Sequence, residues 1–406
     1  MRNAAARRPE PQRIARLPEQ YFTALLGRVA AAAARDGEPL VDLGRGNPDV
    51  GPPPHVAATL DDWARRPDVH GYAPFAGLRE LKDAVAARYR DVYGVDVDAE
   101  REVAVLPGSK TGLMEFAQVC VERGETIVLP DPGYPDYFSA VALAGAQLGT
   151  LPIAPDGAPD WEAAPKEAAA LYLNYPSNPV AACAPDGVFD AAVDYAQRSG
   201  AWILHDFAYG DLVFDGRRPA SFLAADGARE VGLELFSMSK TYGMAGWRLG
   251  FAVGNAELVA RIENLQNHQF AGIFQPVQRA GAAALTGPQE SVEARRATYE
   301  RRRDGALAAL TGATEGGAVF RPGGSGSAAA ASSHGIEARS EGTFFVWLRL
   351  PEDVTPARLL EEQRVAVAPG EGFGARGAGW ARLSLATPDD RLELGLERLR
   401  RGLGLL

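Results

Sequence analysis

Short apolar runs alternate with amphipathic segments in the middle of the chain, and this alternation limits the fold more than any other feature. Four runs read as buried strands: residues 103–108, 126–131, 170–174 and 202–206. Helical patterns, such as residues 186–198, fall between them. Strands that are buried on both faces and joined by helices predict an α/β fold with a mostly parallel sheet.

Several of the predicted strands end in polar or glycine-rich clusters. These clusters are GSK at residues 108–110, DPGY at 131–134 and HDFAY at 205–209. In open α/β sheets, ligands bind beyond the carboxyl ends of the strands. We therefore expect the chemistry of this protein at one edge of one sheet.

The 406 residues are enough for two domains. An arginine-rich helical pattern near residues 288–310 precedes three further strand patterns, 344–350, 365–369 and 381–386, which predict a smaller α+β domain. We divide the chain into an N-terminal segment with part of the small domain (1–45), a large cofactor-binding domain (46–287) and a small C-terminal domain (288–406). A low-complexity stretch within residues 321–342 predicts a flexible insertion.

Charge and composition exclude several classes of partner. A net charge of −10 and a pI near 5.2 predict no binding to nucleic acid or to anionic membrane surfaces. No apolar run is long enough to cross a membrane. Two cysteines in apolar contexts suggest a reducing compartment, so we expect a cytoplasmic protein. Residues 1–20 are basic without the apolar core of a secretory signal; we expect a disordered leader, with a transit peptide as the alternative.

Lys240 lies in the segment SMSKTYGMAGWR, between two apolar runs at residues 231–236 and 249–253. Two serines and Arg248 accompany its amine. A carbonyl-bearing phosphate cofactor needs an amine and phosphate donors, which points to pyridoxal phosphate. A surface lysine in a serine- and glycine-containing loop is the alternative, but the flanking runs place Lys240 at the mouth of a sheet.

Polar residues at other strand ends suit the same cofactor. Asp206 ends a strand pattern and can pair with a protonated pyridine nitrogen, or cap a turn or helix. Asn178 and Tyr209 can donate to a phenolate oxygen, although the Asn-Pro pair also favours a turn. Tyr134 can stack on a planar ring, or be a surface tyrosine in a turn.

Two arginine- and lysine-containing patterns remain. Ser109 and Lys110 follow Gly108 at a predicted helix start, which suits phosphate but also an ordinary N-cap serine. Arg382 interrupts an apolar strand pattern, so it requires a partner: a substrate carboxylate or a structural salt bridge. The five histidines show no metal-ligand spacing and no Ser-His-Asp pattern; we assign His205 to packing.

The chain resembles the fold-type I, class I/II aminotransferases that use pyridoxal phosphate, over nearly its whole length. The branch that it most resembles contains the LL-diaminopimelate, alanine (glutamate–pyruvate) and methionine-salvage aminotransferases. The resemblance lies in motifs in a specific order: LGRGNPD (43–49), HGYAPFAG (70–77), LPGSKTGL (106–113), PDPGYPDY (130–137), NYPSNP (174–179), HDFAYGDLVFDG (205–216) and SMSKTYGMAGWRLGF (237–251).

This resemblance implies a role for each matching position. Lys240 is the Schiff-base lysine and proton shuttle, and Asp206 pairs with the pyridine nitrogen. The other implied roles are phenolate ligands (Asn178, Tyr209), ring stacking (Tyr134), phosphate ligands (Ser109, Lys110, Ser237, Ser239, Arg248), an α-carboxylate ligand (Arg382) and further substrate contacts (Gly46, Tyr21, Asn178). Tyr72 is expected to reach the phosphate of a neighbouring subunit, which implies a homodimer with shared active sites.

Two departures from the family pattern bear on the reaction. The family's NPTG is NPVA here, with Val180 and Ala181, and Gly243 stands where the family usually has asparagine. We predict an aminotransferase for a neutral, methionine-like amino acid, because residues 267–274 are apolar where some relatives bind a distal carboxylate.

The departures keep a second enzyme open. It shares the fold and catalyses γ-elimination, replacement or carbon–carbon bond formation on a methionine derivative such as S-adenosylmethionine. A transcription regulator with an aminotransferase-like domain is a third hypothesis, and it is disfavoured because no helix-turn-helix precedes Leu17 and the chain is acidic.

Overall fold

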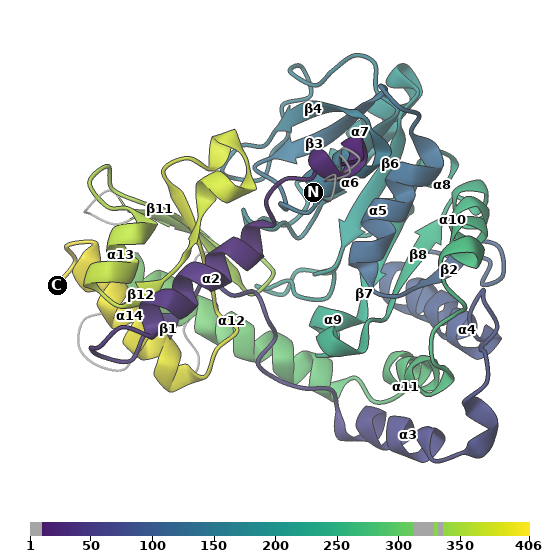
Figure 1. Cartoon of the computed structure of the whole chain (residues 1–406), viewed down its shortest axis with the longest axis horizontal. Coiled ribbons are helices and arrows are strands. Elements are labelled where there is room, and N and C mark those ends of the chain that lie inside the picture. Colours follow the sequence, from purple (N-terminus) through teal and green to yellow (C-terminus); the bar gives the residue numbers. More distant parts are fainter. Residues whose placement is uncertain (1–9, 312–328, 332–335) are drawn as a thin grey trace, which may run out of the picture.

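A seven-stranded sheet forms the centre of the larger part of the molecule in the computed structural model, which describes residues 10–311, 329–331 and 336–406 (Figure 1). The strand order is β2 (Val103–Leu106), β8 (Gly250–Gly254), β7 (Gly232–Ser237), β6 (Trp202–Phe207), β5 (Ala170–Asn174), β3 (Thr126–Asp131) and β4 (Gln147–Pro152). Strands β4, β3, β5, β6 and β7 are parallel, and β8 is antiparallel to both of its neighbours. The prediction of a mostly parallel α/β sheet is confirmed.

The direction of β8 determines what meets at the edge of the sheet. Gly250, at the start of β8, pairs with Leu106 at the end of β2 and with Ser237 at the end of β7. The loops that follow β2 and β7 and the loop that precedes β8 therefore lie at one edge. Segments far apart in the sequence converge there.

Alternating side chains along each strand bury two faces under helices. In β2, Val103 and Val105 belong to one apolar cluster and Ala104 and Leu106 to another, as period-two geometry requires. The second cluster is closed by α5 (Ser109–Cys120), α6 (Tyr137–Ala144) and α10 (Ala256–Gln269). The first is closed chiefly by α4 (Arg79–Arg88), α7 (Val188–Ser199), α11 (Gln275–Thr286) and α3 (Pro54–Ala64).

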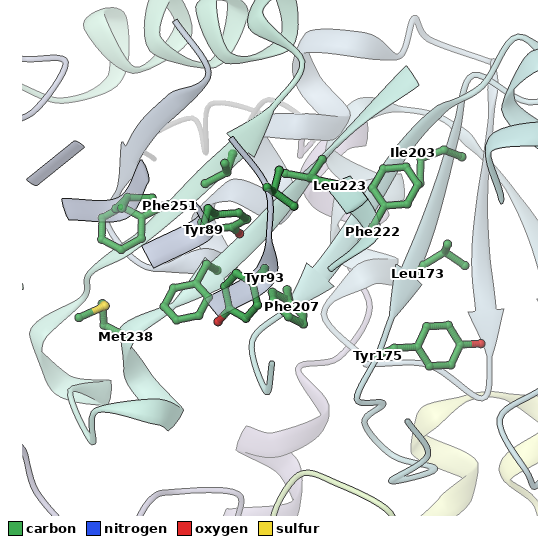
Figure 2. Close-up of a cluster of buried hydrophobic side chains, with 14 of the residues drawn as sticks. Tyr89, Tyr93, Leu173, Tyr175, Ile203, Phe207, Phe222, Leu223, Met238 and Phe251 are labelled. Atoms are coloured by element: carbon green, nitrogen blue, oxygen red, sulfur yellow. The ribbon is translucent and has the colours of Figure 1, made fainter. Parts of the chain in front are cut away.

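Aromatic side chains fill the centre of the first cluster. Figure 2 shows Tyr89 and Tyr93 beside Phe207 and Phe251, with Met238 nearby. The ring centroids of Tyr93 and Phe207 are 5.1 Å apart at an angle of 67°, which is a favourable edge-to-face arrangement. This packing fixes the end of β6, where Asp206 and Tyr209 lie.

A smaller antiparallel sheet lies in the C-terminal part. Its order is β13 (Ala368–Pro369), β14 (Trp380–Ser384), β11 (Phe345–Arg349), β10 (Glu337–Arg339) and β9 (Ala329–Ala331). It packs with α12 (Glu290–Thr311), α13 (Pro356–Glu362) and α14 (Asp389–Gly402). Strand β1 (Val41–Asp42) pairs with β12 (Val365–Ala366), so a segment near the N-terminus joins this part of the molecule.

Within residues 321–342, for which a flexible insertion is predicted, the portion that the structure describes contains two short strands. Residues 337–339 form β10, which pairs with β11, and residues 329–331 form β9, which pairs with β10 at the edge of the sheet. Beyond β10, Glu341 and Gly342 donate backbone hydrogen bonds to the carbonyl of Ala181. Residues 321–328 and 332–335 lie outside the described residues.

Helices α1 (Gln12–Ala15) and α2 (Tyr21–Ala33) begin the described chain, and Figure 1 shows α2 lying across the C-terminal part. The Gln20 side chain caps α2 by accepting a hydrogen bond from the Thr23 backbone. The short helices α8 (Ala228–Val231) and α9 (Met238–Thr241) flank β7. Within the described ranges, no helix combines the length and the apolar character that a membrane span requires.

Candidate active site

A cavity of about 330 Å³ opens at the edge of the large sheet where the predicted site residues lie. Strands β2, β5, β6 and β7 end there, and the loop before β8 starts there. Most of the residues singled out from the sequence line it: Gly46, Ser109, Lys110, Tyr134, Asn178, Asp206, Tyr209, Ser237, Ser239, Lys240, Arg248 and Arg382. The structure thus brings together twelve of the fourteen candidates.

Lys240 lies on α9, directly after β7, and its side chain is partly buried. Its Nζ donates a hydrogen bond to the carbonyl oxygen of Gly46 at 3.0 Å. Burial, followed by the positive charges of Arg382 and Arg248, lowers the pKa of this amine to about 8, while Asp206 acts in the opposite direction. A substantial fraction of Lys240 is therefore neutral near pH 8, which a nucleophilic amine requires.

Asp206, the penultimate residue of β6, is a buried carboxylate held by a tyrosine. Its Oδ2 accepts a hydrogen bond from the Tyr137 hydroxyl at 2.8 Å, and its Oδ1 accepts one from the Ala208 backbone at 3.2 Å. Burial raises the pKa of Asp206, and the Tyr137 hydrogen bond opposes that shift. A cationic ring nitrogen at this position would offset the cost of burying the carboxylate.

An anion cradle forms where β2, β7 and β8 meet. Helix α5 begins at Ser109 with no side chain capping its first turn, so its backbone N–H groups face the cavity edge uncapped. The Arg248 guanidinium lies against Gly108, in the space that a Cβ would fill. Ser237 and Ser239 complete the lining. Uncapped N–H groups, two hydroxyls and a guanidinium fit a phosphate.

Lys110 enters this cradle differently from the expectation. Its Nζ pairs with Asp136 Oδ2 at 2.9 Å, and Gln20 donates to the other oxygen of Asp136 at 2.9 Å. The ammonium of Lys110 therefore already has an acidic partner. Its backbone N–H, in the first turn of α5, remains at the cradle.

Arg382 on β14 is a buried guanidinium that faces the cavity. Nη1 donates to Asn178 Oδ1 at 2.7 Å, and Nη2 donates to the carbonyl of Gly44 at 2.9 Å. Its Nε is buried without a hydrogen-bond partner among the described residues, none of which places a carboxylate within 4.0 Å of the guanidinium. Burial lowers the pKa of Arg382. The structural salt bridge that was the alternative for this residue is absent from the described chain, and a carboxylate ligand fits.

Two candidates do not line the cavity. Tyr21 is expected to cap the pocket; its hydroxyl donates to the carbonyl of Pro369 at 2.7 Å, its ring packs against Phe373, and its capping role stays a prediction. The adjacent residue, Phe22, lines the cavity instead. Tyr72 is 85% exposed and contributes nothing to the cavity of its own chain.

Sequence reasoning missed residues on both sides of the cavity. Phe22, Leu25 and Leu26 of α2 form an apolar wall. The centroid of the Phe345 ring, on β11, lies 3.9 Å from the guanidinium carbon of Arg382. Arg45 lies beside Gly46 at the cavity. The motifs LGRGNPD and PDPGYPDY contain Arg45 and Tyr137, so position within a motif was the available signal.

The departures at residues 180–181 lie in backbone packing. Ala181 has φ +58°, in the left-handed region that favours glycine, and its carbonyl accepts from Glu341 and Gly342. Val180 is buried and does not line the cavity. Neither side chain touches the space in which a substrate would react.

Gly243 leaves space for Arg295, which acts as a clamp on the backbone of the segment after Gly46. It has φ +67°, and a Cβ there would collide with the carbonyl of Val50 and lie 2.8 Å from Arg295 Nη2. Arg295 donates to the carbonyls of Val50 and Gly51 at 2.8 and 2.9 Å. The glycine therefore lets this arginine hold the backbone that leads out of the cavity.

Comparisons with known proteins give consistent matches. The family model for aminotransferase class I and II matches residues 38–399. The L-glutamine–4-(methylsulfanyl)-2-oxobutanoate aminotransferase of Bacillus subtilis (strain 168) is 41% identical over 394 residues, covering 94% of each chain. The LL-diaminopimelate aminotransferase of Moorella thermoacetica is 37% identical, covering 97% of this chain and 98% of the relative. The solved structure of substrate-bound BacF from Bacillus subtilis superposes with a TM-score of 0.86 at 34% identity, covering 97% and 98%.

Proposed function

We propose, from the premise that this chain belongs to the class I and II aminotransferases, that its amino-acid substrate is neutral and methionine-like. The chain is an enzyme that uses pyridoxal 5′-phosphate to move an amino group between an amino acid and a 2-oxo acid. The observation that carries the substrate proposal is the composition of the cavity: one buried guanidinium, Arg382, beside an apolar wall of α2.

The residues of the cavity suit each part of this cofactor. We assign the phosphate to Arg248, Ser237, Ser239 and the first turn of α5, including Ser109 and Lys110 through its backbone. We assign the ring nitrogen to Asp206, the phenolate oxygen to Asn178 and Tyr209, and the ring face to Tyr134. The cofactor supplies an electron sink for negative charge at the substrate α-carbon. The burial of Asp206 and its tyrosine hydrogen bond keep the carboxylate in place for that task.

Arg382 and Lys240 divide the work on the substrate. The free Nε of Arg382 is available to the α-carboxylate, and Phe345 beneath the guanidinium fixes its plane. Lys240 Nζ, with a pKa of about 8, would accept the proton from the substrate α-carbon and return it to the carbon on the other side of the amino nitrogen. Its hydrogen bond to the Gly46 carbonyl supports this role, since Gly46 is proposed to contact the substrate.

The apolar wall is the reason for a neutral substrate. Phe22, Leu25 and Leu26 offer a substrate side chain contacts without a charge. A thioether is unbranched and polarizable, and it suits such a surface. One relative is named for 4-(methylsulfanyl)-2-oxobutanoate, which has this side chain.

The alternative reactions on a methionine derivative lose their motivation in the structure. They were kept open because of Val180, Ala181 and Gly243. These residues line no part of the cavity and act on the backbone around it. We therefore retain transamination.

We further infer a homodimer with shared sites and a cytoplasmic location. Tyr72 supports the first inference, since a tyrosine that is 85% exposed in one subunit is available to a second. Two free cysteines agree with a reducing compartment.

A half-reaction screen tests the proposed function. Each amino acid is added alone to the purified, cofactor-loaded enzyme, and the visible spectrum and the released 2-oxo acid are followed. We expect conversion with methionine and other neutral, unbranched amino acids; Lys240→Ala should lack the visible band of the lysine-bound cofactor before any amino acid is added and should release no 2-oxo acid. Release of a γ-substituent together with ammonium, with the cofactor still in its aldehyde form, would support the alternative chemistry, and a wild type that binds no pyridoxal phosphate would refute the assignment.

A further inference from the structure

We propose that a buried ion pair between Arg88 and Asp211 positions Lys240 in the active site, by holding the two residues that follow this lysine in the chain. Neither member of the pair lines the cavity, so both act on the reaction through other residues. The proposal rests on the proposed function, because it takes Lys240 as the amine that bonds the cofactor.

Lys240 lies in a helical turn that needs support from the rest of the fold. Helix α9 contains only residues 238–241, and one turn of helix is unstable alone because its nucleation fixes more backbone than one hydrogen bond repays. The Ser237 hydroxyl caps the start of α9 by accepting from the Ser239 backbone at 3.2 Å. The direction of the Lys240 side chain therefore depends on what holds the other end of the turn.

The first residue after Lys240 is held by Asp211. Thr241 is buried, and its hydroxyl donates to Asp211 Oδ2 at 2.9 Å. The other carboxylate oxygen, Oδ1, accepts from Arg88 Nη2 at 2.7 Å and from the Tyr93 hydroxyl at 2.8 Å. Hydrogen bonds to an ionised acceptor are stronger than neutral ones. Three donors thus fix the carboxylate, and the carboxylate fixes Thr241.

The second residue after Lys240 is linked to the same guanidinium by another route. The Tyr242 hydroxyl donates to Gln289 Oε1 at 2.9 Å, and Arg88 Nη1 donates to the same oxygen at 3.3 Å. The Gln289 amide is itself held, since its Nε2 donates to two backbone carbonyls around the end of α11 at 2.9 and 2.8 Å. Both residues that follow Lys240 are therefore connected to Arg88.

The backbone after α4 brings Arg88 and Tyr93 to one carboxylate. Arg88 ends α4, and a π-helical turn, Tyr89–Tyr93, follows it directly. In an α-helix, side chains five residues apart lie about 140° from each other around the axis. The wider π-helical turn brings such residues closer to one face, and turns of this kind are rare and frequent at functional sites.

Asp211 also connects Lys240 to Tyr209. Residues 208–211 form the turn after β6, and the Leu212 backbone donates to the Tyr209 carbonyl at 2.8 Å. Lys240 Nζ lies 5.8 Å from the centroid of the Tyr209 ring. Because the Asp211 carboxylate bonds Thr241, it joins the turn that carries Tyr209 to the turn that carries Lys240. It thereby sets the spacing of two groups that we assign to the cofactor.

Stability alone is a poor explanation for this ion pair. The two side chains are only 6% and 5% exposed, and the cost of desolvating such a pair offsets much of its attraction. Arg88 Nε is also buried without a hydrogen-bond partner among the described residues. Apolar side chains of similar volume would fill the space at lower cost, but they would not bond Thr241.

Thr241→Val tests the proposal and leaves both charges of the pair in place. The variant keeps the branched shape of the side chain and removes its hydrogen bond to Asp211. Tyr172→Phe is the matched control, because it removes a buried hydroxyl that donates to the Leu113 carbonyl at 2.7 Å in the second apolar cluster. We expect a similar loss of thermal stability in both variants and an effect on Lys240 only in Thr241→Val.

Covalent capture of pyridoxal phosphate by the cofactor-free protein measures how well the amine is placed. We expect the plateau rate at high pH to fall about tenfold in Thr241→Val, because misplacing a reacting group slows a reaction strongly. The midpoint should stay near pH 8, since burial and the charges of Arg382 and Arg248 lower the pKa of Lys240 to about 8. Thr241→Ser should recover most of the rate. An unchanged plateau, or an equal fall in Tyr172→Phe, overturns the proposal.

Steady-state kinetics gives a second readout on the loaded enzyme. We expect kcat for methionine to fall about tenfold in Thr241→Val and KM to stay within twofold of wild type, because the amine acts on bound substrate. A rise in KM with unchanged kcat overturns the positioning of Lys240.

Hydrogen exchange of the cofactor-free protein separates this proposal from the proposed function. We expect the amides of residues 238–242 to exchange about tenfold faster in Thr241→Val than in wild type, and at the wild-type rate in Tyr172→Phe. Equal exchange in all three proteins overturns the role of the ion pair while transamination stands. A wild type that captures no pyridoxal phosphate overturns the proposed function instead, and the exchange rates still decide whether Asp211 holds the turn of Lys240.

Discussion

Arg382 donates from Nη1 to the side-chain oxygen of Asn178 at 2.7 Å, and its buried Nε has no partner among the described residues. A guanidinium held in this way has two fixed contacts, and its Nε–H is left without a hydrogen bond in the described chain. The amide of Asn178 thereby keeps its own NH₂ group available to the cavity. The pair joins the smaller sheet to the loop after β5.

Replacing Arg382 by lysine should impair the reaction although the charge is kept. A lysine cannot bond Asn178, Gly44 and a substrate carboxylate in one plane. We expect kcat/KM for methionine to fall by about tenfold to a hundredfold, the equivalent of one lost charged hydrogen bond. Steady-state kinetics with Arg349→Lys, an exposed arginine of β11, as the control measures this effect. Unchanged kinetics in Arg382→Lys would remove Arg382 from the site.

The pKa of Lys240 predicts how the empty enzyme takes up its cofactor. An amine with a pKa of about 8 is protonated below that pH and becomes nucleophilic above it. The rate of covalent capture of pyridoxal phosphate should therefore rise between about pH 7 and pH 9 and then level off. Stopped-flow absorbance measures the rate, and the reaction of N-acetyl-lysine in the same buffers corrects for the cofactor. A rate that still climbs tenfold per pH unit above pH 9 would contradict the lowered pKa.

Ala181→Gly should stabilise the protein. Ala181 has φ +58°, a conformation that costs alanine about 1–2 kcal/mol and glycine nothing, while glycine adds about 0.4–1 kcal/mol of unfolded-state entropy. We expect a net gain of up to about 1 kcal/mol in the free energy of unfolding, measured by denaturant titration. Ala182→Gly, one residue on and outside the left-handed region, is the control and should lose stability. A loss in both variants would refute the strain at residue 181.

Gly243→Asn restores the residue that the family resemblance predicts, and here it should destabilise the enzyme. Asparagine tolerates the φ of +67°, but its Cβ collides with the Val50 carbonyl and crowds Arg295. We expect a loss of about 1–3 kcal/mol, typical of overpacking, and a weaker hold on residues 46–51. Thermal unfolding checks this expectation against Gly246→Asn, where a Cβ meets nothing within 4 Å. Equal melting temperatures for the two variants would show that the clamp is unimportant.

The strands of the large sheet were predictable because burial on both faces leaves continuous apolar runs. Two other strands were not predictable: the edge strand β4 (Gln147–Pro152) is largely exposed in its first residues, and β10 has a glutamate and an arginine at its ends. These strands form because a neighbouring strand offers unpaired backbone groups. Their own sequences do not identify that neighbour. The low-complexity composition of residues 321–342 predicted a flexible insertion, and composition carries no information about which strands pair.

Motifs predicted most of the residues that line the cavity. They did not predict the direction in which each side chain points. Tyr21 and Phe22 are adjacent, and one step along a helix turns a side chain by about 100°, so a motif finds the helix and not the residue that enters the cavity. The pairing of Lys110 with Asp136 joins residues from different loops, and only the folded chain brings them together. Arg45 belongs to the motif LGRGNPD, but the motif did not indicate that this side chain lines the cavity.

The antiparallel course of β8 has a consequence for how the enzyme can be monitored. The phosphate cradle is assembled from the ends of β2 and β7 and the approach to β8, three neighbours in one sheet. The cradle is lost if these strands separate. The described strands of the smaller sheet contribute only Arg382 and Phe345 to the cavity. The visible absorbance of the bound cofactor should therefore report on the large sheet alone. It should be lost when the large sheet unfolds and should persist while the C-terminal part unfolds locally.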